Sequence, residues 1–279
     1  VMAAPSASEI NLPFTTVNEM LALATEKMFP LSELAIMYEN ARTGLSRNTI
    51  LEKMEDIVLI IKKSIDEGLK GTHFEDRILG AQAPLIDKAE KAGHIPKTIN
   101  STIIAYTAAQ MEVKSSIGLI VAAPTAGSCG VLGGALFGSL QEEFDLNAMV
   151  RAFLAAGITG VFISAGYTFS AEEGGCQVEA GSGSAMAAAG LVELYGGTAK
   201  QAIDAASMAL QNQLGLICDP VADRVEVPCL GKNIMAATNA YNACIMSLAG
   251  FDAVIPYQEV IDAMKSVGES LPSTLCCTG

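Results

Sequence analysis

Three cysteines in glycine- and proline-rich segments are the residues of this chain whose types and spacing could do chemistry. Cys176 lies in SAEEGGCQVEAGSGS, and Cys218 and Cys229 lie in LGLICDPVADRVEVPCL. Pro220 and Pro228 each remove a backbone donor and disfavour helix at the preceding residue, so this second segment reads as a loop. Paired glycines let the backbone of the first segment pass close to a bulky group. The pattern indicates thiols presented by loops to a metal or a cluster.

The spacing of these cysteines bears on which metal they could hold. Cys218 follows Cys176 by 42 positions, and Cys229 follows Cys218 by 11. Zinc sites commonly contain a close C-x₂₋₄-C pair, which these three cysteines lack. Three thiolates also suit an iron-sulfur cluster in which one iron stays open.

A second glycine-rich loop runs over residues 121–134, and in it Thr125 and Ser128 shortly precede Cys129. We expect a helix to start at about Val131. Hydroxyls and backbone N–H groups at a helix start form a cradle for an anion such as a substrate carboxylate. A Walker phosphate loop is excluded because its Lys-Ser/Thr ending is absent. The alternative is a tight helix connection in which the glycines only allow close packing.

Together, GGCQVE, GLICDPVADRVEVPC, GKNIMAATNAY and APTAGSCGVLGG resemble the alpha subunit of the iron-sulfur-dependent L-serine dehydratases, most clearly over residues 118–279. The resemblance implies a [4Fe-4S] cluster held by Cys176, Cys218 and Cys229, with one iron open to the hydroxyl and carboxylate of a small amino-acid substrate. It implies loss of water from L-serine, followed by imine hydrolysis to pyruvate and ammonia. Cys129 is left outside this ligand set.

The catalytic residues predicted beside the cluster are Thr125, Ser128, Lys232 and His73. Lys232 supplies a cation that could meet the substrate carboxylate or balance the charge of the cluster. The base that removes the α-proton stays open among His73, Lys232 and a hydroxyl of the 125–128 loop.

Two further features leave the function open. The segment GTHFEDRILGAQ departs from the Gly- and Ser-rich loop of the relatives, so L-cysteine, L-threonine or another hydroxy acid are alternative substrates. A non-catalytic iron-sulfur redox sensor is the alternative from another class. Cys276 and Cys277 near the end of the chain could act as a temporary fourth ligand.

Composition narrows the class of protein. A net charge of −13 argues against a nucleic-acid partner, and a 51% hydrophobic content is ample for a core. Seven cysteines are an odd count, and no signal sequence opens the chain, so we expect a reducing cytoplasm. The most apolar run, residues 152–165, is too short to cross a bilayer, and we expect a buried core helix there.

The expected fold is all-α: a single helical domain over residues 14–279, behind an N-terminal arm at 1–13, with its glycine- and proline-rich loops converging on a buried cluster site. Apolar residues recur at helical spacing and no alternating strand pattern appears. The resemblance also implies a separate beta subunit, and the sequence leaves homo- or hetero-oligomeric assembly open. The main expected helices cover residues 15–28, 31–41, 48–67, 98–117, 145–164, 177–195, 199–214, 234–249 and 256–267.

Overall fold

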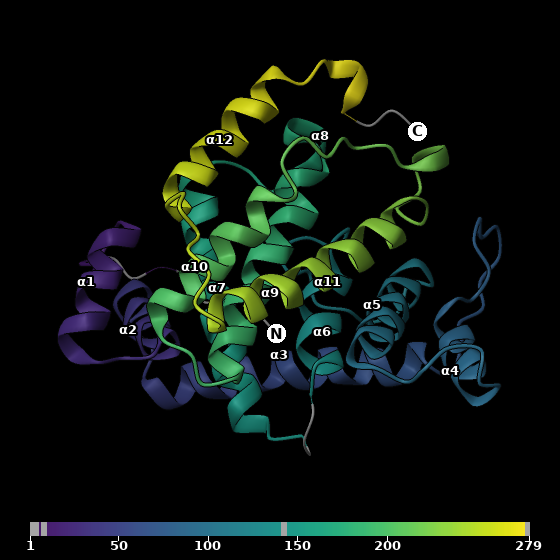
Figure 1. Cartoon of the computed structure of the whole chain (residues 1–279), viewed down its shortest axis with the longest axis horizontal. Coiled ribbons are helices and arrows are strands. Elements are labelled where there is room, and N and C mark those ends of the chain that lie inside the picture. Colours follow the sequence, from purple (N-terminus) through teal and green to yellow (C-terminus); the bar gives the residue numbers. More distant parts are fainter. Residues whose placement is uncertain (1–5, 7–9, 141–143, 277–279) are drawn as a thin grey trace.

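The computed structural model describes residue 6 and residues 10–140 and 144–276, and these residues form helices joined by loops (Figure 1). Within this part of the chain there is no strand, and one isolated bridge pairs Cys218 with Cys276. The prediction of an all-α fold is confirmed. The α-helices are α1 (Val17–Lys27), α2 (Leu31–Thr43), α3 (Arg47–Gly68), α4 (Ala83–Lys91), α5 (Ile99–Ser115), α6 (Cys129–Gly138), α7 (Leu146–Gly166), α8 (Ala171–Gly174), α9 (Ser182–Leu194), α10 (Ala199–Gln211), α11 (Cys229–Leu248) and α12 (Tyr257–Ser270). A π-helical turn, η1 (Gln177–Gly181), and two 3₁₀ turns, η2 (Val221–Asp223) and η3 (Ser273–Leu275), complete the list.

Side-chain caps fix where several of these helices begin. Ser46 accepts a hydrogen bond from the backbone N–H of Thr49 at the start of α3. Thr16, Thr98 and Thr198 each form a capping box at the start of α1, α5 and α10. Such caps satisfy backbone donors that have no partner inside the helix and contribute about 1 kcal/mol each.

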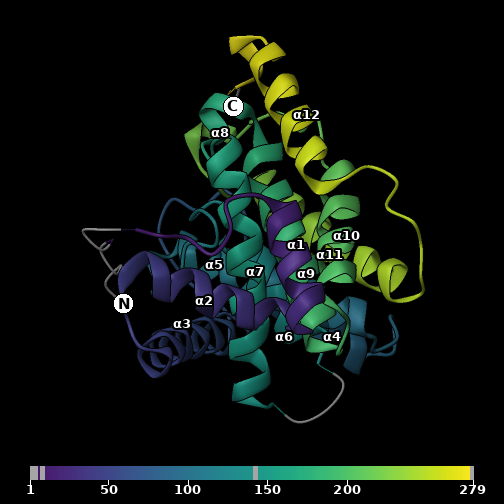
Figure 2. The same ribbon diagram turned by 90° about the vertical axis from the view of Figure 1, so that its left-hand side faces the viewer.

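Helix α9 forms the centre of the fold and packs against α6, α7, α10 and α11 (Figures 1 and 2). Its sequence, SGSAMAAAGLVEL, is buried from Ser182 to Val192. Small side chains on every face let the four neighbouring helices approach closely. The small-residue sequence therefore produces a central helix rather than a surface one.

The contact between α5 and α6 requires glycine. A methyl group at Gly134 would lie 2.0 Å from Thr107 Oγ1 and 2.8 Å from Thr107 Cα. The second of these atoms belongs to the backbone, so it cannot move without moving α5. Because α6 starts at Cys129, this close contact also fixes the loop that precedes it.

Helix α7 contains the most apolar stretch of the described chain. It is long and apolar enough to cross a membrane by length and composition, but 67% of its most apolar window is buried in the protein. It contacts α2, α3 and α9. This burial is what the sequence predicts for a core helix, although the helix is longer than the apolar run.

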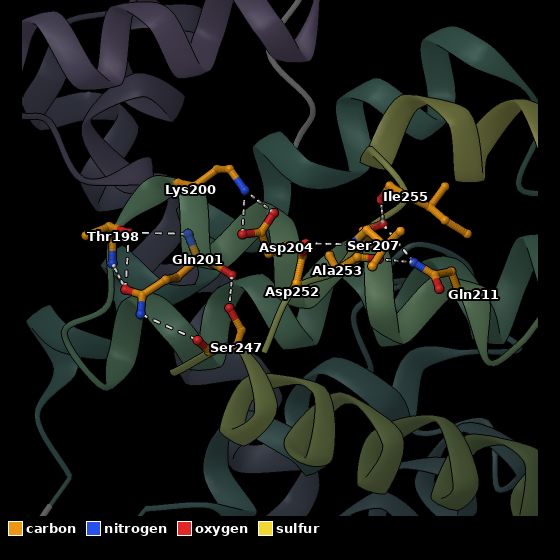
Figure 3. A network of polar contacts seen from close by, with 11 residues as sticks. Thr198, Lys200, Gln201, Asp204, Ser207, Gln211, Ser247, Asp252, Ala253 and Ile255 are labelled. Atoms are coloured by element: carbon orange, nitrogen blue, oxygen red, sulfur yellow. Dashed lines mark hydrogen bonds and ion pairs between the residues drawn. The ribbon is translucent and has the colours of Figure 1, made fainter. Parts of the chain in front are cut away.

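A polar network joins α10 to α11 and to the loop that precedes α12 (Figure 3). The Ser207 hydroxyl donates to the Ile255 carbonyl at 2.6 Å, and Gln211 Nε2 donates to the Ala253 carbonyl at 3.3 Å. The Ser247 hydroxyl donates to the Gln201 carbonyl at 2.7 Å. These bonds set the direction in which α12 leaves, toward α8 (Figure 2).

Several predicted boundaries are wrong. Helix α11 begins at Cys229 rather than at Ile234, so Lys232 lies inside the helix and not in a lead-in loop. Helix α10 ends at Gln211, three residues before the predicted end at 214. Helix α6 begins at Cys129 instead of about Val131. At the starts of α6 and α11, Gly130 and Gly231 lie inside the helices, where the sequence predicted loop.

Candidate active site

The three predicted ligand cysteines lie on three neighbouring segments. Cys176 precedes η1, Cys218 lies in the stretch after α10, and Cys229 is the first residue of α11. Their exposed fractions are 4%, 7% and 6%. Cys176 and Cys218 pack in one small apolar cluster with Leu216. Cys229 packs in another with Met111 and Cys129, so the three thiols divide between two clusters.

A glycine allows Cys176 to approach the Cys218 segment. Gly175 has φ +75°, and a methyl group there would lie 2.4 Å from the Leu216 carbonyl oxygen. The backbone N–H of Gln177 donates to the same Leu216 carbonyl at 3.2 Å. Only glycine fits this left-handed conformation and this close approach, which explains the Gly-Gly pair before Cys176.

The side chain of Gln177 ties three distant segments together beside Cys176. It is fully buried. Its Nε2 donates to the carbonyls of Gly174 and Met264 at 2.9 and 3.0 Å, and its Oε1 accepts from the Gly215 N–H at 2.9 Å. One amide therefore links the Cys176 turn to α12 and to the segment that leads to Cys218.

The segment before the chain's C-terminus contacts the Cys218 loop. The backbone N–H of Cys218 donates to the Leu275 carbonyl at 3.1 Å, and Cys218 and Cys276 form a parallel bridge. Cys276 is partly exposed, with its Sγ 4.0 Å from the Glu173 carbonyl oxygen. Cys277 lies outside the described residues. The fold thus brings Cys276 beside one predicted ligand.

Two lysines provide positive charge around the thiols. Burial raises the pKa of Cys176 to about 11, and the charge of Lys232 opposes this rise. Burial also raises the pKa of Cys229, and Lys114 opposes it most strongly. Burial lowers the pKa of Lys114 itself. Protonated thiols in this setting would lose their protons on metal binding, and the two cations would partly balance the resulting thiolates.

Lys232 is held over the Cys218 loop. Its ammonium donates to the Ile217 carbonyl at 2.6 Å and forms an ion pair with Asp219. Lys114, at the end of α5, donates to the carbonyl of Val225 in the same loop. Sequence reasoning predicted Lys232 and missed Lys114, which is far from the cysteines in sequence and lies in the last turn of α5.

The predicted anion cradle holds a carboxylate of the chain itself. Thr125 Oγ1 lies 3.0 Å from Ser128 Oγ and accepts from the Ser128 N–H at 3.2 Å. The Thr125 hydroxyl also donates to Glu179 Oε1, and a methyl group at Gly127 would lie 2.4 Å from that oxygen. Burial raises the pKa of Glu179. Sequence reasoning missed Glu179, although a lone carboxylate in QVEAGSGSAMAAAG was an available signal.

Asn233 connects this loop to α11. Its Nδ2 donates to the carbonyls of Gly127 and Cys229 at 2.8 and 2.9 Å. Because Lys232 precedes it in the first turns of α11, the cation and the amide are positioned by the same helix that begins with Cys229.

The predicted residue His73 does not meet the others directly. Its side chain is exposed, and within the described residues it makes no hydrogen bond or ion pair with them. Its loop is nevertheless attached to the cysteine loop: Glu226 Oε2 accepts from the N–H groups of Ile78 and Leu79 at 3.1 and 3.4 Å. Glu226, also missed from the sequence, therefore helps to hold this loop beside the site, together with Arg224, whose guanidinium donates to the Asp76 carbonyl.

The donor set has the chemistry of a site for a thiolate-bound group. In the described part of the chain, no three His, Cys, Asp or Glu side chains converge closely enough to hold one metal ion. A single tetrahedral ion with metal–sulfur bonds of about 2.3 Å needs its sulfur ligands within about 4 Å of one another. An iron-sulfur cluster distributes its thiolates over several irons and accepts more widely spaced cysteines. Three buried thiols with two nearby cations are consistent with such an anionic group.

Comparison with known proteins agrees with the resemblance seen in the sequence. A probable L-serine dehydratase alpha chain of Bacillus subtilis is 36% identical over 272 residues, covering 95% of this chain and 89% of the relative. The L-serine dehydratase alpha chain of Peptoniphilus asaccharolyticus is 34% identical over 267 residues, or 95% and 91% of the two chains. L-serine dehydratase 1 of Escherichia coli is 32% identical over 277 residues, and the match covers 61% of its length. The family described as serine dehydratase alpha chain matches residues 26–279. The chain therefore belongs to the serine dehydratase alpha-chain family of lyases.

Proposed function

We propose that this chain is the subunit that carries the active site of an L-serine dehydratase, forming pyruvate and ammonia, and that residues 14–279 are its catalytic region. Family membership supports the reaction. The observation that supports the cofactor is that Cys176, Cys218 and Cys229 are all buried and lie on segments joined by hydrogen bonds from Gln177 to Leu216 and from Lys232 to Ile217. These three would hold a [4Fe-4S] cluster, which when bound supplies a Lewis acid for the departure of hydroxide from the substrate.

The residues of the chain would bind and orient the substrate beside this group. Lys232 and Lys114 would attract the substrate carboxylate and balance the thiolates. Thr125 and Ser128 would place hydroxyls over the reacting carbon, and with His73 and Lys232 they remain the candidates for the base. Loss of the α-proton and of hydroxide gives an enamine, which becomes an imine and is hydrolysed by water to pyruvate and ammonia.

A second chain completes this proposal. Two relatives bear the name alpha chain, and the single-chain relative from Escherichia coli is considerably longer than the match. We expect a separate beta subunit to supply the remainder, in a cytoplasmic enzyme. The proposed partners are that subunit and the amino-acid substrate.

Anaerobic loading with iron and sulfide tests the proposal. Wild type, Cys218→Ala and the control Cys244→Ala are compared, because Cys244 is a fully buried core thiol of α11. We expect cluster absorption, iron and acid-labile sulfide, and pyruvate from L-serine in wild type and control, with the beta chain added. All are lost in Cys218→Ala.

Each other outcome has a meaning. If the wild type binds a cluster and turns over L-cysteine or L-threonine but not L-serine, the proposed substrate is wrong and the other amino acid takes its place. A cluster without turnover of any of these would favour the redox sensor. Absence of iron from the wild type, or iron retained by Cys218→Ala, would refute the ligand assignment.

A further inference from the structure

Asn233 leaves a hydrogen-bond acceptor unused inside the site. The residue is 2% exposed, and its Nδ2 is committed to the carbonyls of Gly127 and Cys229. These two acceptors fix the orientation of the amide, so its other end must be the oxygen. Within the described residues no donor reaches Asn233 Oδ1. A buried acceptor without a donor is costly, and in a native protein it calls for a ligand or a bound water.

Glu179 offers a second acceptor beside the same glycine. Its Oε1 accepts from the Thr125 hydroxyl and lies against Gly127, where a methyl group would be 2.4 Å away. Its second oxygen, Oε2, would lie 2.8 Å from the same methyl group. The Asn233 amide therefore binds the carbonyl of Gly127, and the Glu179 carboxylate lies against the Cα of the same residue.

An unused amide oxygen and a carboxylate, both beside Gly127, suit one kind of group. A primary ammonium carries three N–H donors and a positive charge, and it can serve both oxygens at once. A carboxylate in the same place would be repelled by Glu179. A neutral hydroxyl has one donor and no charge to offer.

The cations of the site lie where they complement this arrangement. Lys114 and Lys232 are both near enough to influence the charge of Glu179, and they are fixed to the cysteine loop at Val225 and Ile217. An amino acid has one group for each set: a carboxylate for the lysines and an ammonium for the two acceptors. The charges of the site are thus arranged to complement the carboxylate and the ammonium of a zwitterionic amino acid.

We infer that Glu179 and Asn233 form the subsite for the α-ammonium group of the substrate, and that they select amino acids over 2-hydroxy acids. The inference rests on the proposed function and deepens it, because it names the group that distinguishes L-serine from its analogue L-glycerate, in which a hydroxyl replaces the ammonium. Thr125 then acts by holding Glu179 in place.

The test compares wild type, Glu179→Gln and the control Glu172→Gln in the anaerobically loaded enzyme. Glu172 is exposed, hydrogen-bonded to Ser170 and also within charge range of Glu179, so its loss removes a nearby charge outside the subsite. Dissociation constants for L-serine and L-glycerate are read from ligand-induced changes in the cluster spectrum, alongside kcat and KM for L-serine.

We expect Glu179→Gln to weaken L-serine binding roughly 10- to 100-fold, as for loss of a charge-assisted hydrogen bond, and to leave L-glycerate binding unchanged or tighter. Glu172→Gln should change neither. If Glu179→Gln fails to load, Gly127→Ala serves instead, because it displaces the carboxylate without removing it.

The outcomes separate the two claims. Suppose that the wild type turns over L-serine, but Glu179→Gln binds L-serine and L-glycerate equally more weakly, or binds both as tightly as wild type. Either result would overturn the ammonium subsite and leave the proposed function standing. A wild-type enzyme that neither binds nor turns over L-serine would overturn both.

Discussion

Adding one methyl group at Gly127 should change substrate binding without unfolding the protein. The new Cβ would lie 2.4 Å from Glu179 Oε1 and 2.8 Å from its Cδ. Ordinary contacts between such atoms are about 3.5 Å, so the carboxylate must move by about 1 Å. A side-chain torsion of this kind costs about 1 kcal/mol. Replacement of glycine by alanine recovers about 0.4–1 kcal/mol of unfolded-chain entropy, so the free energy of unfolding should change by less than about 1 kcal/mol.

Gly134→Ala provides a matched control, because there the added methyl group meets the backbone of α5 instead of a movable side chain. Its Cβ would lie 2.0 Å from Thr107 Oγ1 and 2.8 Å from Thr107 Cα, which moves only with α5. Overpacking of this kind costs about 1–3 kcal/mol, and alanine in a helix returns about 1 kcal/mol over glycine. We expect a net loss of about 1–2 kcal/mol in the free energy of unfolding.

Urea denaturation and serine kinetics in the loaded enzyme separate the two variants. Gly127→Ala should keep its urea midpoint within about 0.5 M of wild type while its KM for L-serine rises roughly 10-fold. Gly134→Ala should lose stability and keep its KM. A Gly127→Ala enzyme with wild-type KM would refute the role given to the Glu179 carboxylate, and one that unfolds early would show that the carboxylate cannot move.

Three further predictions concern the surroundings of the site. Glu226→Ala removes the acceptor of two loop N–H groups, so trypsin should cut after Arg77 about 10-fold faster; an unchanged rate would mean that other contacts hold the loop. Burial raises the pKa of Glu112, so its stabilising contribution is present below the unfolded value of about 4.3 and is lost as pH rises through the folded value. In urea denaturation, Glu112→Gln should therefore gain stability relative to wild type as the pH rises from about 4.3 through the folded value, and a constant difference would contradict this. Ser207→Ala leaves the Ile255 carbonyl without its donor and should cost about 1 kcal/mol, measured by thermal unfolding; no loss would show that water replaces the hydroxyl.

The fold was largely predictable because its helices carry local signals. The long helix α3 has a Ser46 cap and an amphipathic pattern, and both are properties of neighbouring residues. The start of α11 was not predictable in the same way. Gly231 in its first turn reads as a loop residue, and the helix is supported there by Asn233, which donates back to the Cys229 carbonyl. That bond depends on burial, which the sequence pattern does not report.

The site was predictable only in part. The cysteines were recognisable by type and by their segments, and the structure packs Cys176 and Cys218 in one apolar cluster and Cys229 in another. Glu179 stands out in the sequence only as a lone carboxylate among small residues; its contact with Thr125 was not predictable, because the two are 54 residues apart and nothing indicates which way a side chain in η1 points. Lys114 was missed for the same reason. Contacts between distant segments determine both, and a single sequence contains no direct record of them.

The buried amide of Gln177 also bears on when the metal site can form during synthesis. It connects the Cys176 turn to the Met264 carbonyl, 87 residues later, as well as to Gly215. A nascent chain in which all three cysteines have emerged still lacks α12, and the Cys176 turn then lacks one of its anchors. Domains fold largely as units during synthesis, so maturation of the site should wait for α12. A chain released after residue 256 should accordingly bind no iron, although it contains Cys176, Cys218 and Cys229.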